Sequence, residues 1–334
     1  MTEMPRKWAE RLAHHANCSN RRSVAELLLT LGLFSATWLV MMAVCHISPW
    51  LALALSPVAA LLLVRLFAIQ HDCAHYSWLT SRTANEWVGR VLGVLTLTPH
   101  DMWKHSHTLH HAGSGNLDRR GFGDIETMTV AEYDAHGFVE RLKYRLYRNP
   151  VVMFVLGPSY VFLLQHRLPV GYMSRSGGYW TNVMATNAGI AVLFSALIFA
   201  FGWKAFVIVH LPVVVVGATI GIWLFYVQHQ FDPAFWERAP KWERERAALH
   251  GSSFYDLPKP LMWFTGNIGI HHVHHLASRI PFYRLPAVLQ EFPLFAKTNR
   301  LTVWQSLRCV RFALWDAETA TMISFRQHAT LKSA

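Results

Sequence analysis

Cysteine and charge are both scarce in this sequence, and each scarcity excludes a class of protein. The four cysteines, Cys18, Cys45, Cys73 and Cys309, stand far apart without a C-x-x-C pair, so the sequence indicates neither a disulfide framework nor a thiolate metal site. Only 15% of the residues are charged and 52% are hydrophobic, which departs from soluble proteins towards membrane proteins. Any metal must therefore be held by nitrogen and oxygen.

Motifs for bound redox cofactors are absent as well. We find no glycine-rich dinucleotide motif, no ferredoxin cysteine set and no haem attachment motif, and there is no internal repeat or low-complexity tract. We therefore expect a single domain over residues 1–334. The net charge of +11 does not indicate nucleic-acid binding, because Lys and Arg are spread over the segments that flank apolar runs. That distribution is typical of basic cytoplasmic loops in a membrane protein.

Four apolar runs are long enough to cross a bilayer. They cover residues 24–45, 50–69, 183–201 and 205–227. The first run alone predicts roughly 33 Å of helix at 1.5 Å per residue. Two shorter runs, at residues 88–97 and 151–164, predict buried or interfacial segments because they are too short to cross.

The distribution of basic residues predicts which side of the membrane each loop occupies. The two short loops, residues 46–49 and 202–204, contain no basic residue and one lysine, respectively. Nearly all other Lys and Arg residues fall in the basic arm at residues 1–23, in residues 71–182 and from residue 228 onward. Four crossings with both termini and both long regions, 71–182 and 228–334, in the cytoplasm satisfy this bias.

Histidine is abundant, and eight of the 20 histidines stand at regular spacings within three clusters. The clusters are His71 with His75, then His107, His110 and His111, and then His271, His274 and His275. Residues at i, i+3 and i+4 project from one face of a helix, so each H-x-x-H-H cluster predicts a shared metal. Every cluster adjoins an apolar segment. If all three lie at one membrane face, they form one site.

The number of imidazoles predicts two metal ions, because a zinc site takes only three or four protein ligands. Imidazole suits iron, copper, zinc and nickel about equally, so the ligand type does not select the metal. The Glu-x-x-His spacing of soluble di-iron proteins does not occur here. A pair of irons held by histidine is the remaining known solution for oxygen chemistry.

Several neighbouring residues are candidates for supporting this site. They are Asp72, His105, Asp118, Asp124, Asn267 and His272. Carboxylates commonly accept the second ring N–H of a metal-bound imidazole, and the alternative for these three aspartates is an ordinary surface position. The two histidines lie inside clusters but off the shared spacing, so they are supporting or spacer residues. The asparagine either faces the site or caps a helix.

The histidine spacing resembles that of the membrane fatty acid desaturases, which have boxes of the forms H-x3-4-H, H-x2-3-H-H and H/Q-x2-H-H. All three boxes are present, and the resemblance extends over about residues 60 to 315. The flanking sequence is most similar to bacterial acyl-lipid desaturases of the delta-12 or omega-6 type. The similar segments are Asn116–Arg120 (NLDRR), Tyr144–Pro150 (YRLYRNP), Phe225–Phe231 (FYVQHQF) and Ser278–Arg284 (SRIPFYR).

This resemblance implies an all-α integral membrane protein with four spanning helices, short interfacial helices and a cytoplasmic helical cap. It implies a location in the bacterial inner membrane, two iron ions, dioxygen as co-substrate, and His229 at the end of the last span as a ninth ligand. In the animal acyl-CoA members, an asparagine one turn before that histidine contributes through water. Phe225 stands at this position here and cannot do so.

The activity implied by the resemblance is insertion of a cis double bond, most closely at the delta-12 position of a monounsaturated acyl chain on a membrane lipid. An unactivated methylene has no acidic proton, so its oxidation requires oxygen chemistry on a metal. The two electrons must come from outside, because the chain has no redox motif of its own. The resemblance suggests a ferredoxin or a cytochrome b5-like donor with its reductase.

Two alternatives stay open at this point. A hydroxylase, epoxygenase or carotenoid oxygenase uses the same boxes with a different outcome, and only the flanking segments favour desaturation. A membrane metal transporter would place its ligands near the bilayer midplane, whereas these clusters lie at the ends of spans and in loops.

Overall fold

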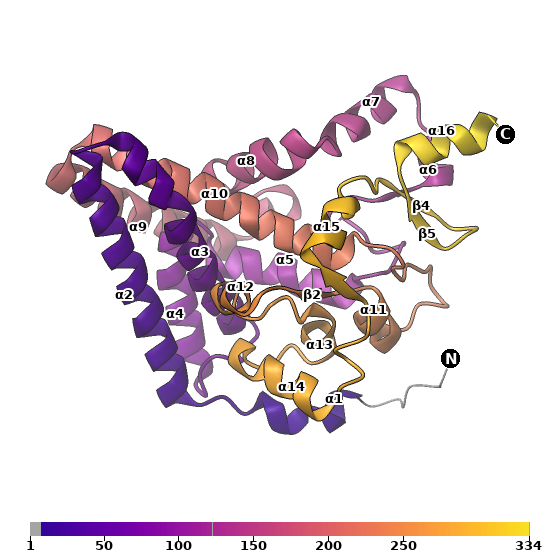
Figure 1. Cartoon of the computed structure of the whole chain (residues 1–334), viewed down its shortest axis with the longest axis horizontal. Helices are drawn as coiled ribbons and strands as arrows, with labels where there is room; N and C mark the ends of the chain where they lie inside the picture. Colours follow the sequence, from indigo (N-terminus) through magenta and orange to yellow (C-terminus); the bar gives the residue numbers. More distant parts are fainter. Residues whose placement is uncertain (1–7, 122, 334) are drawn as a thin grey trace.

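Four long helices form one side of the molecule. The computed structural model describes residues 8–121 and 123–333, so the first part of the expected basic arm, residues 1–7, lies outside the described residues. The long helices are α2 (Asn20–Cys45), α3 (Pro49–Ala74), α9 (Gly177–Phe201) and α10 (Trp203–His229), and each is apolar and long enough to cross a membrane. In Figure 1, α2, α3 and α9 lie at the left, α10 runs from there into the middle, and most of the short elements lie to the right. The predicted membrane character and mostly helical fold are confirmed.

The long helices extend beyond the predicted runs at their polar ends. α3 continues to Ala74, so His71 and Asp72 still belong to it, and α9 begins at Gly177. Polar residues can continue a helix where the fold gives their side chains partners. The first histidine box is therefore part of a spanning helix rather than of the loop that follows it.

α3 is the most buried of the four long helices, and it contains a charged residue. Arg65 is 1% exposed. Its guanidinium lies 2.6 Å from the carboxylate of Glu26 on α2 and also donates to the backbone carbonyl of Trp263. A charge inside a span is costly unless it is paired. This pair therefore joins α2, α3 and the region after α10.

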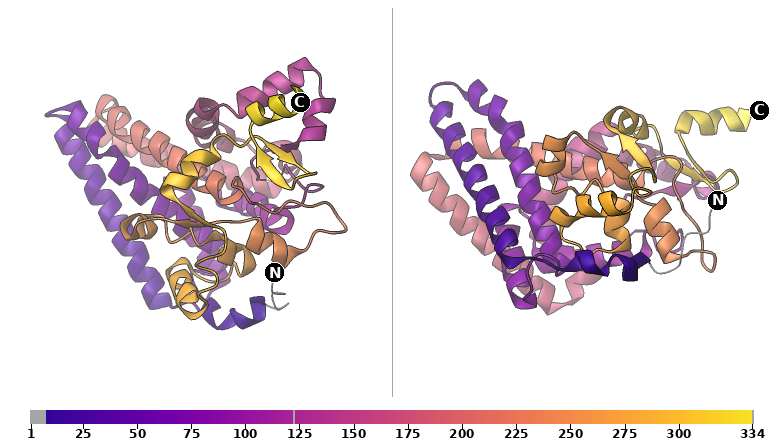
Figure 2. Two further views of the ribbon diagram at one scale, coloured as in Figure 1. Left: turned by 45° about the vertical axis from the view of Figure 1, so that its right-hand side comes forward. Right: turned by 60° about the horizontal axis from the view of Figure 1, so that its bottom comes forward.

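The two short apolar runs form helices that pack beside the spans. The run at residues 88–97 lies mostly in α4 (Arg82–Leu95), which packs on α3 and α9. The run at 151–164 forms a π-helical segment, η2 (Val152–Leu156), followed by α8 (Gly157–Leu163), and both pack along α10. Figure 2 shows these shorter helices beside the long ones from two further directions.

The cap is built from short helices and a few short strands. Its helices are α5 (His100–Gly113), α6 (Val130–Ala135), α7 (Phe138–Tyr147), α11 (Arg244–His250), α12 (Lys259–Phe264), α13 (His271–Leu276), α14 (Leu285–Glu291), α15 (Val303–Cys309) and α16 (Phe325–Ser333). The N-terminal segment adds α1 (Trp8–Arg11) and the 3-10 turn η1 (Ala13–Ala16). Further 3-10 turns are η3 (Gln165–Arg167), η4 (Gly171–Arg175) and η5 (Phe282–Arg284).

Five short strands were not expected in an all-α protein. β1 (Met128–Thr129) pairs in parallel with β4 (Leu314–Asp316), which is antiparallel to β5 (Thr321–Ile323). β2 (Phe254–Asp256) pairs in parallel with β3 (Arg300–Thr302). These pairings join segments that are distant in sequence, so local patterns carry little signal for them. They tie the C-terminal region to the middle of the chain.

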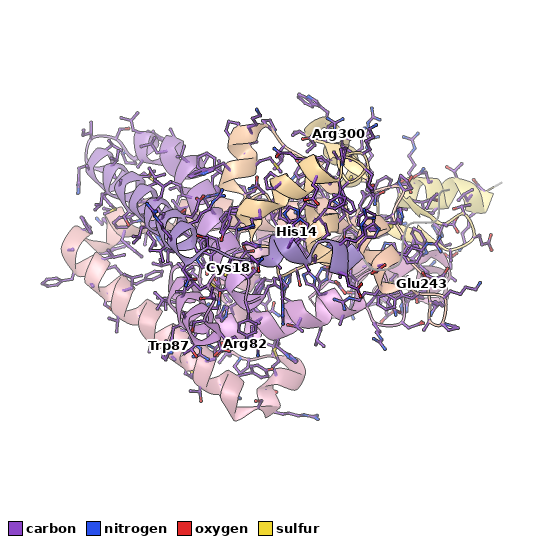
Figure 3. The ribbon with its side chains drawn as sticks, turned by 90° about the horizontal axis from the view of Figure 1, so that it is seen from below. His14, Cys18, Arg82, Trp87, Glu243 and Arg300 are labelled. Atoms are coloured by element: carbon purple, nitrogen blue, oxygen red, sulfur yellow. The ribbon has the colours of Figure 1, made fainter. Side chains whose placement is uncertain are left out.

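The N-terminal segment closes the underside of the cap. The rings of His14 and His15 lie 2.9 and 2.8 Å from a carboxylate oxygen of Glu291 in α14. In Figure 3, His14 and Cys18 lie between α4, where Arg82 and Trp87 are labelled, and the C-terminal part of the cap with Arg300. The segment that leads into α2 is therefore joined to α14 of the cap.

Candidate metal centre

All nine histidines predicted as ligands come together at one place, from four helices. His71 lies in the last turn of α3 and His75 directly follows that helix. α5 contributes three histidines, α13 contributes three more, and His229 is the last residue of α10. The site therefore lies where two long helices end and the cap begins.

Five of these histidines form the first group, which contains His71, His75, His107, His111 and His274. Their ligand atoms all lie within 4.8 Å of one another. The Nε2 atom of His107 is 3.0 Å from that of His75 and 3.0 Å from that of His111. The Nε2 atom of His274 is 3.1 Å from that of His111. The imidazoles therefore point their Nε2 atoms at a common centre.

The second group contains His110, His229, His271 and His275, whose ligand atoms also lie within 4.8 Å of one another. The Nε2 atom of His229 is 3.1 Å from that of His110 and 2.9 Å from that of His271. All four side chains are buried. The two groups are neighbours, because the rings of His111 and His275 stack with centroids 4.1 Å apart.

The second ring nitrogen of several ligands has a partner that fixes the ring. The Nδ1 atom of His110 bonds the carboxylate of Asp124, and the Nδ1 atom of His71 lies 3.4 Å from a carboxylate oxygen of Asp72. His229 places its Nδ1 atom 3.2 Å from the carbonyl oxygen of Gly251. An acceptor at Nδ1 leaves Nε2 unprotonated and free to bind a metal.

Burial keeps the ligands of the cap neutral. The pKa values of His107, His111, His274 and His275 lie well below the ordinary value, first because burial disfavours the charged form and then because neighbouring imidazoles repel a further charge. A metal ligand must be a neutral imidazole. The site therefore offers its imidazoles in the protonation state that a metal requires.

The predicted supporting residues divide into two sets. Asp72 and Asp124 contact ligands, and the second carboxylate oxygen of Asp72 also accepts a 2.7 Å hydrogen bond from the amide of Phe282. Asp118 instead lies 2.6 Å from the guanidinium of Arg238 at the surface. Its carboxylate also accepts from the amide of Ala239, and among the described residues it has no contact with a histidine of the two groups.

The other three predicted supporting residues lie outside the two groups. The side chain of Asn267 donates to the carbonyl of Phe282, and its backbone has a φ of +52°, so it shapes a turn before α13. The Nε2 atom of His272 lies 3.0 Å from the carbonyl of Phe295 in the core. The ring of His105 lies against Tyr179.

Two aromatic residues next to the ligands were not predicted as part of the site. Trp103 stacks on the ring of His107 with centroids 4.6 Å apart, and it stands one helical turn earlier in α5. Phe225 lies 5.1 Å from the ring of His110 and 5.4 Å from that of His229. The i and i+4 spacing could have revealed both contacts. Phe225 makes this wall apolar where an asparagine would supply a polar atom.

A cavity of about 660 Å³ adjoins both groups. His71 and His107 of the first group and His271 of the second contribute to its wall. Most of the remaining wall is apolar and comes from α3, α5, η2, α8 and α10. Ligand pockets typically measure about 300–1,000 Å³. The arrangement can therefore hold a long apolar molecule next to two metal ions.

Comparison with known proteins agrees with this geometry. A sequence model described as fatty acid desaturase matches residues 48–306, a range that contains all nine histidines. A fatty acid desaturase of Bacillus subtilis (strain 168) is 42% identical over 317 residues, which cover 95% of this chain and 90% of the relative. An sn-1 acyl-lipid omega-3 desaturase (ferredoxin) of Synechocystis is 29% identical over 264 residues, covering 72% of this chain and 68% of the relative. An sn-1 oleoyl-lipid 12-desaturase of Anabaena variabilis is 24% identical over 260 residues, with the same two coverages.

Proposed function

Given that this chain belongs to the fatty acid desaturase family and is an oxidoreductase, we propose that it introduces a cis double bond into an acyl chain esterified to a membrane lipid. The reaction consumes dioxygen, two external electrons and two protons, removes two hydrogens from neighbouring carbons and releases two waters. We place the bond at the delta-12 position of a monounsaturated chain, as the similarity to the Anabaena enzyme suggests.

One observation carries this proposal: two groups of converging imidazoles form part of the wall of an apolar cavity. Nine nitrogen donors in groups of five and four fit two metal ions better than one. We propose that all nine histidines are ligands and that both ions are iron. Bound iron would supply the oxygen chemistry that an unactivated methylene requires.

The protein's own residues position the acyl chain. Phe67, Trp103 and Phe225 supply apolar surface beside the ligands, so the chain packs against them and water is excluded. Reacting atoms must be held near contact distance, which a close-fitting wall achieves without polar contacts. Asp72 and Asp124 hold ligand rings in place during this reaction.

The substrate enters from the bilayer in this proposal, because the cavity runs between helices that span or adjoin the membrane. Val214 and Gly217 on α10 and Leu63 on α3 belong to its wall and lie within spans. We propose that both termini and the site are cytoplasmic, in the inner membrane of a bacterium. A ferredoxin or cytochrome b5-like protein with its reductase then delivers the electrons, in keeping with the ferredoxin-linked relatives.

Expression in a host that makes oleate but no dienes tests the reaction directly. With a compatible electron donor, gas chromatography with mass detection should detect linoleate in the membrane lipids. Hydroxylated or epoxidised oleate would instead assign the chain to the hydroxylase or epoxygenase class. Unchanged acyl chains together with oxygenated carotenoids would refute the substrate class.

Metal analysis tests the centre separately. The purified protein should contain close to two irons per chain, and His75→Ala should lose iron and activity together. His136→Ala is the matched control, because His136 is exposed and lies in neither metal group. Active protein that contains zinc and negligible iron would refute the di-iron assignment.

A further inference from the structure

Two parts of the cavity wall differ in character. One part lies between α3 and α10, where Leu63, Val214 and Gly217 belong to the spans. The other part is the segment after α8 with Gln165 and His166, and we call it the polar end; Arg167 follows these two residues directly and lies behind the wall rather than in it. An acyl lipid has the same asymmetry, because one end of its chain is a methyl group and the other is an ester next to a polar headgroup.

The polar end is held in a fixed conformation. The guanidinium of Arg167, through Nη2, donates to the backbone carbonyl of Leu97. Leu97 has a φ of +55°, a conformation that costs a leucine energy and turns this carbonyl towards the arginine. The side-chain amide of Asn187 on α9 donates to the backbone carbonyl of Arg167 over 2.8 Å. The turn η3 is therefore tied to the end of α4 and to α9.

Several polar atoms at this end are buried and have no hydrogen-bond partner among the described residues. They are the Nε and Nη1 atoms of Arg167, the Nδ1 atom of His166 and the Oδ1 atom of Asn187. The two guanidinium nitrogens can only donate, whereas neutral His166 already bonds the backbone of Leu97 through its other ring nitrogen, so its Nδ1 atom is an acceptor. Burial lowers the pKa of Arg167 to about 10, so the side chain keeps its charge at neutral pH. Buried donors of this kind call for an acceptor.

We propose that Arg167, which directly follows His166 of the cavity wall, binds the oxygen atoms at the polar end of a glycerolipid substrate and so fixes the start of the acyl chain. This inference rests on the proposed function and names the part of the lipid that the cavity recognises. An ester carbonyl and a phosphate both offer the required oxygen acceptors. Arginine suits either of them, and its bonds to a phosphate are charge-assisted.

A continuous aromatic wall leads from this subsite to the metal groups. His166 lies 5.2 Å from Phe162, Phe162 lies 6.4 Å from Phe67, and Phe67 lies 5.0 Å from Trp103, measured between ring centroids. Trp103 in turn stacks on the ligand His107. All these rings belong to the cavity wall. An acyl chain held at Arg167 therefore presents a fixed carbon, counted from its ester, to the metals.

The wild-type protein tests this counting rule without any substitution. Lipids that carry oleoyl chains, or chains two carbons longer with the same delta-9 double bond, should receive the new double bond at the same number of carbons from the ester. A bond that instead stays at a constant distance from the methyl end would overturn the inference while leaving the desaturase function intact.

Arg167→Gln tests the residue itself. We expect the KM for phospholipid to rise roughly 10-fold or more, because the variant loses a charge-assisted hydrogen bond to the lipid. The change in kcat should be smaller. The positions of the new double bond should also spread, and Arg167→Lys should restore part of the selectivity. Lys143→Gln is the control, because it removes one positive charge from an exposed position on α7. Equal KM and unchanged positions in Arg167→Gln would refute the role.

Lipid binding gives a readout that does not depend on turnover. In native mass spectrometry, the iron-loaded wild-type protein should retain a phospholipid that Arg167→Gln releases. A glycolipid with the same acyl chains distinguishes the two acceptors, because it has the esters but no phosphate. Retention of both lipids assigns the ester, and retention of the phospholipid alone assigns the phosphate. If Arg167→Gln does not fold, Arg167→Met provides the same comparison, and equal retention by a folded variant would contradict the proposal.

Discussion

Asp124 and Asp118 lie in the same loop after α5. Replacing Asp124 by asparagine should weaken the metal centre, whereas replacing Asp118 by asparagine should leave it unchanged. The carboxylate of Asp124 is 10% exposed and accepts from the Nδ1 atom of His110, whereas that of Asp118 is 38% exposed and pairs with Arg238. Loss of such a partner typically costs about 10–100-fold in metal affinity or activity. That factor corresponds to about 1.4–2.8 kcal/mol. An exposed ion pair contributes only about 0–1 kcal/mol.

We therefore expect Asp124→Asn to lose iron at a chelator concentration about 10–100-fold lower than the wild type does. Asp118→Asn should retain its iron as the wild type does. The assay is elemental analysis of purified protein after a chelator series, with thermal unfolding as a check that both variants are folded. Equal iron retention in the two variants would refute the orienting role of Asp124, and iron loss confined to Asp118→Asn would reverse the assignment.

Three further predictions concern the membrane arrangement, the packing and the cavity. Reporter fusions after residue 203 should give an external signal and fusions after residue 300 a cytoplasmic one; an external signal at 300 would contradict the four-span arrangement. Gly89→Ala should lower thermal stability by about 1–3 kcal/mol, because its Cβ would lie 2.3 Å from the buried ring of His100. Gly32→Ala, whose Cβ would meet nothing within 4 Å, should show no loss, and equal melting temperatures of the two variants would refute the packing argument. Gly221→Leu should fill open space in the cavity wall and favour shorter acyl chains, which product analysis with chains of several lengths can measure.

The membrane fold and the grouping of the histidines were accessible from the sequence for different reasons. Hydropathy identifies spans because a helix that crosses the bilayer core is apolar over about 20 residues, whether its side chains face lipid or other helices. Spacing groups His107, His110 and His111 because a helix places them on one face. Loop charge then predicts that all three boxes share one side. Each of these inferences depends on a pattern within one segment, namely its hydropathy, its residue spacing or its charge. Contacts with distant segments do not change such a pattern.

The supporting residues were less accessible because they depend on contacts between distant segments. Asp118 and Asp124 look alike in sequence, but Arg238 attracts the first, and the loop places the second against His110. The carbonyl of Gly251 that contacts His229 has no sequence signal, because every residue has a carbonyl. Arg167 is likewise a single arginine in a loop. Only its buried donors beside the cavity distinguish it.

The exposure of the ligands also bears on how electrons reach the proposed irons. Seven of the nine histidines are buried, whereas His75 and His111 keep partial exposure. Neither of these two histidines lines the cavity. The ligands that do line it are His71, His107 and His271. Both partly exposed ligands belong to the group of five. Under the proposed function, the acyl chain and the external electron donor would approach the centre from different sides, and a bound lipid would not block reduction. Electrons that enter through His75 and His111 would then arrive first at the metal-binding group of five imidazoles.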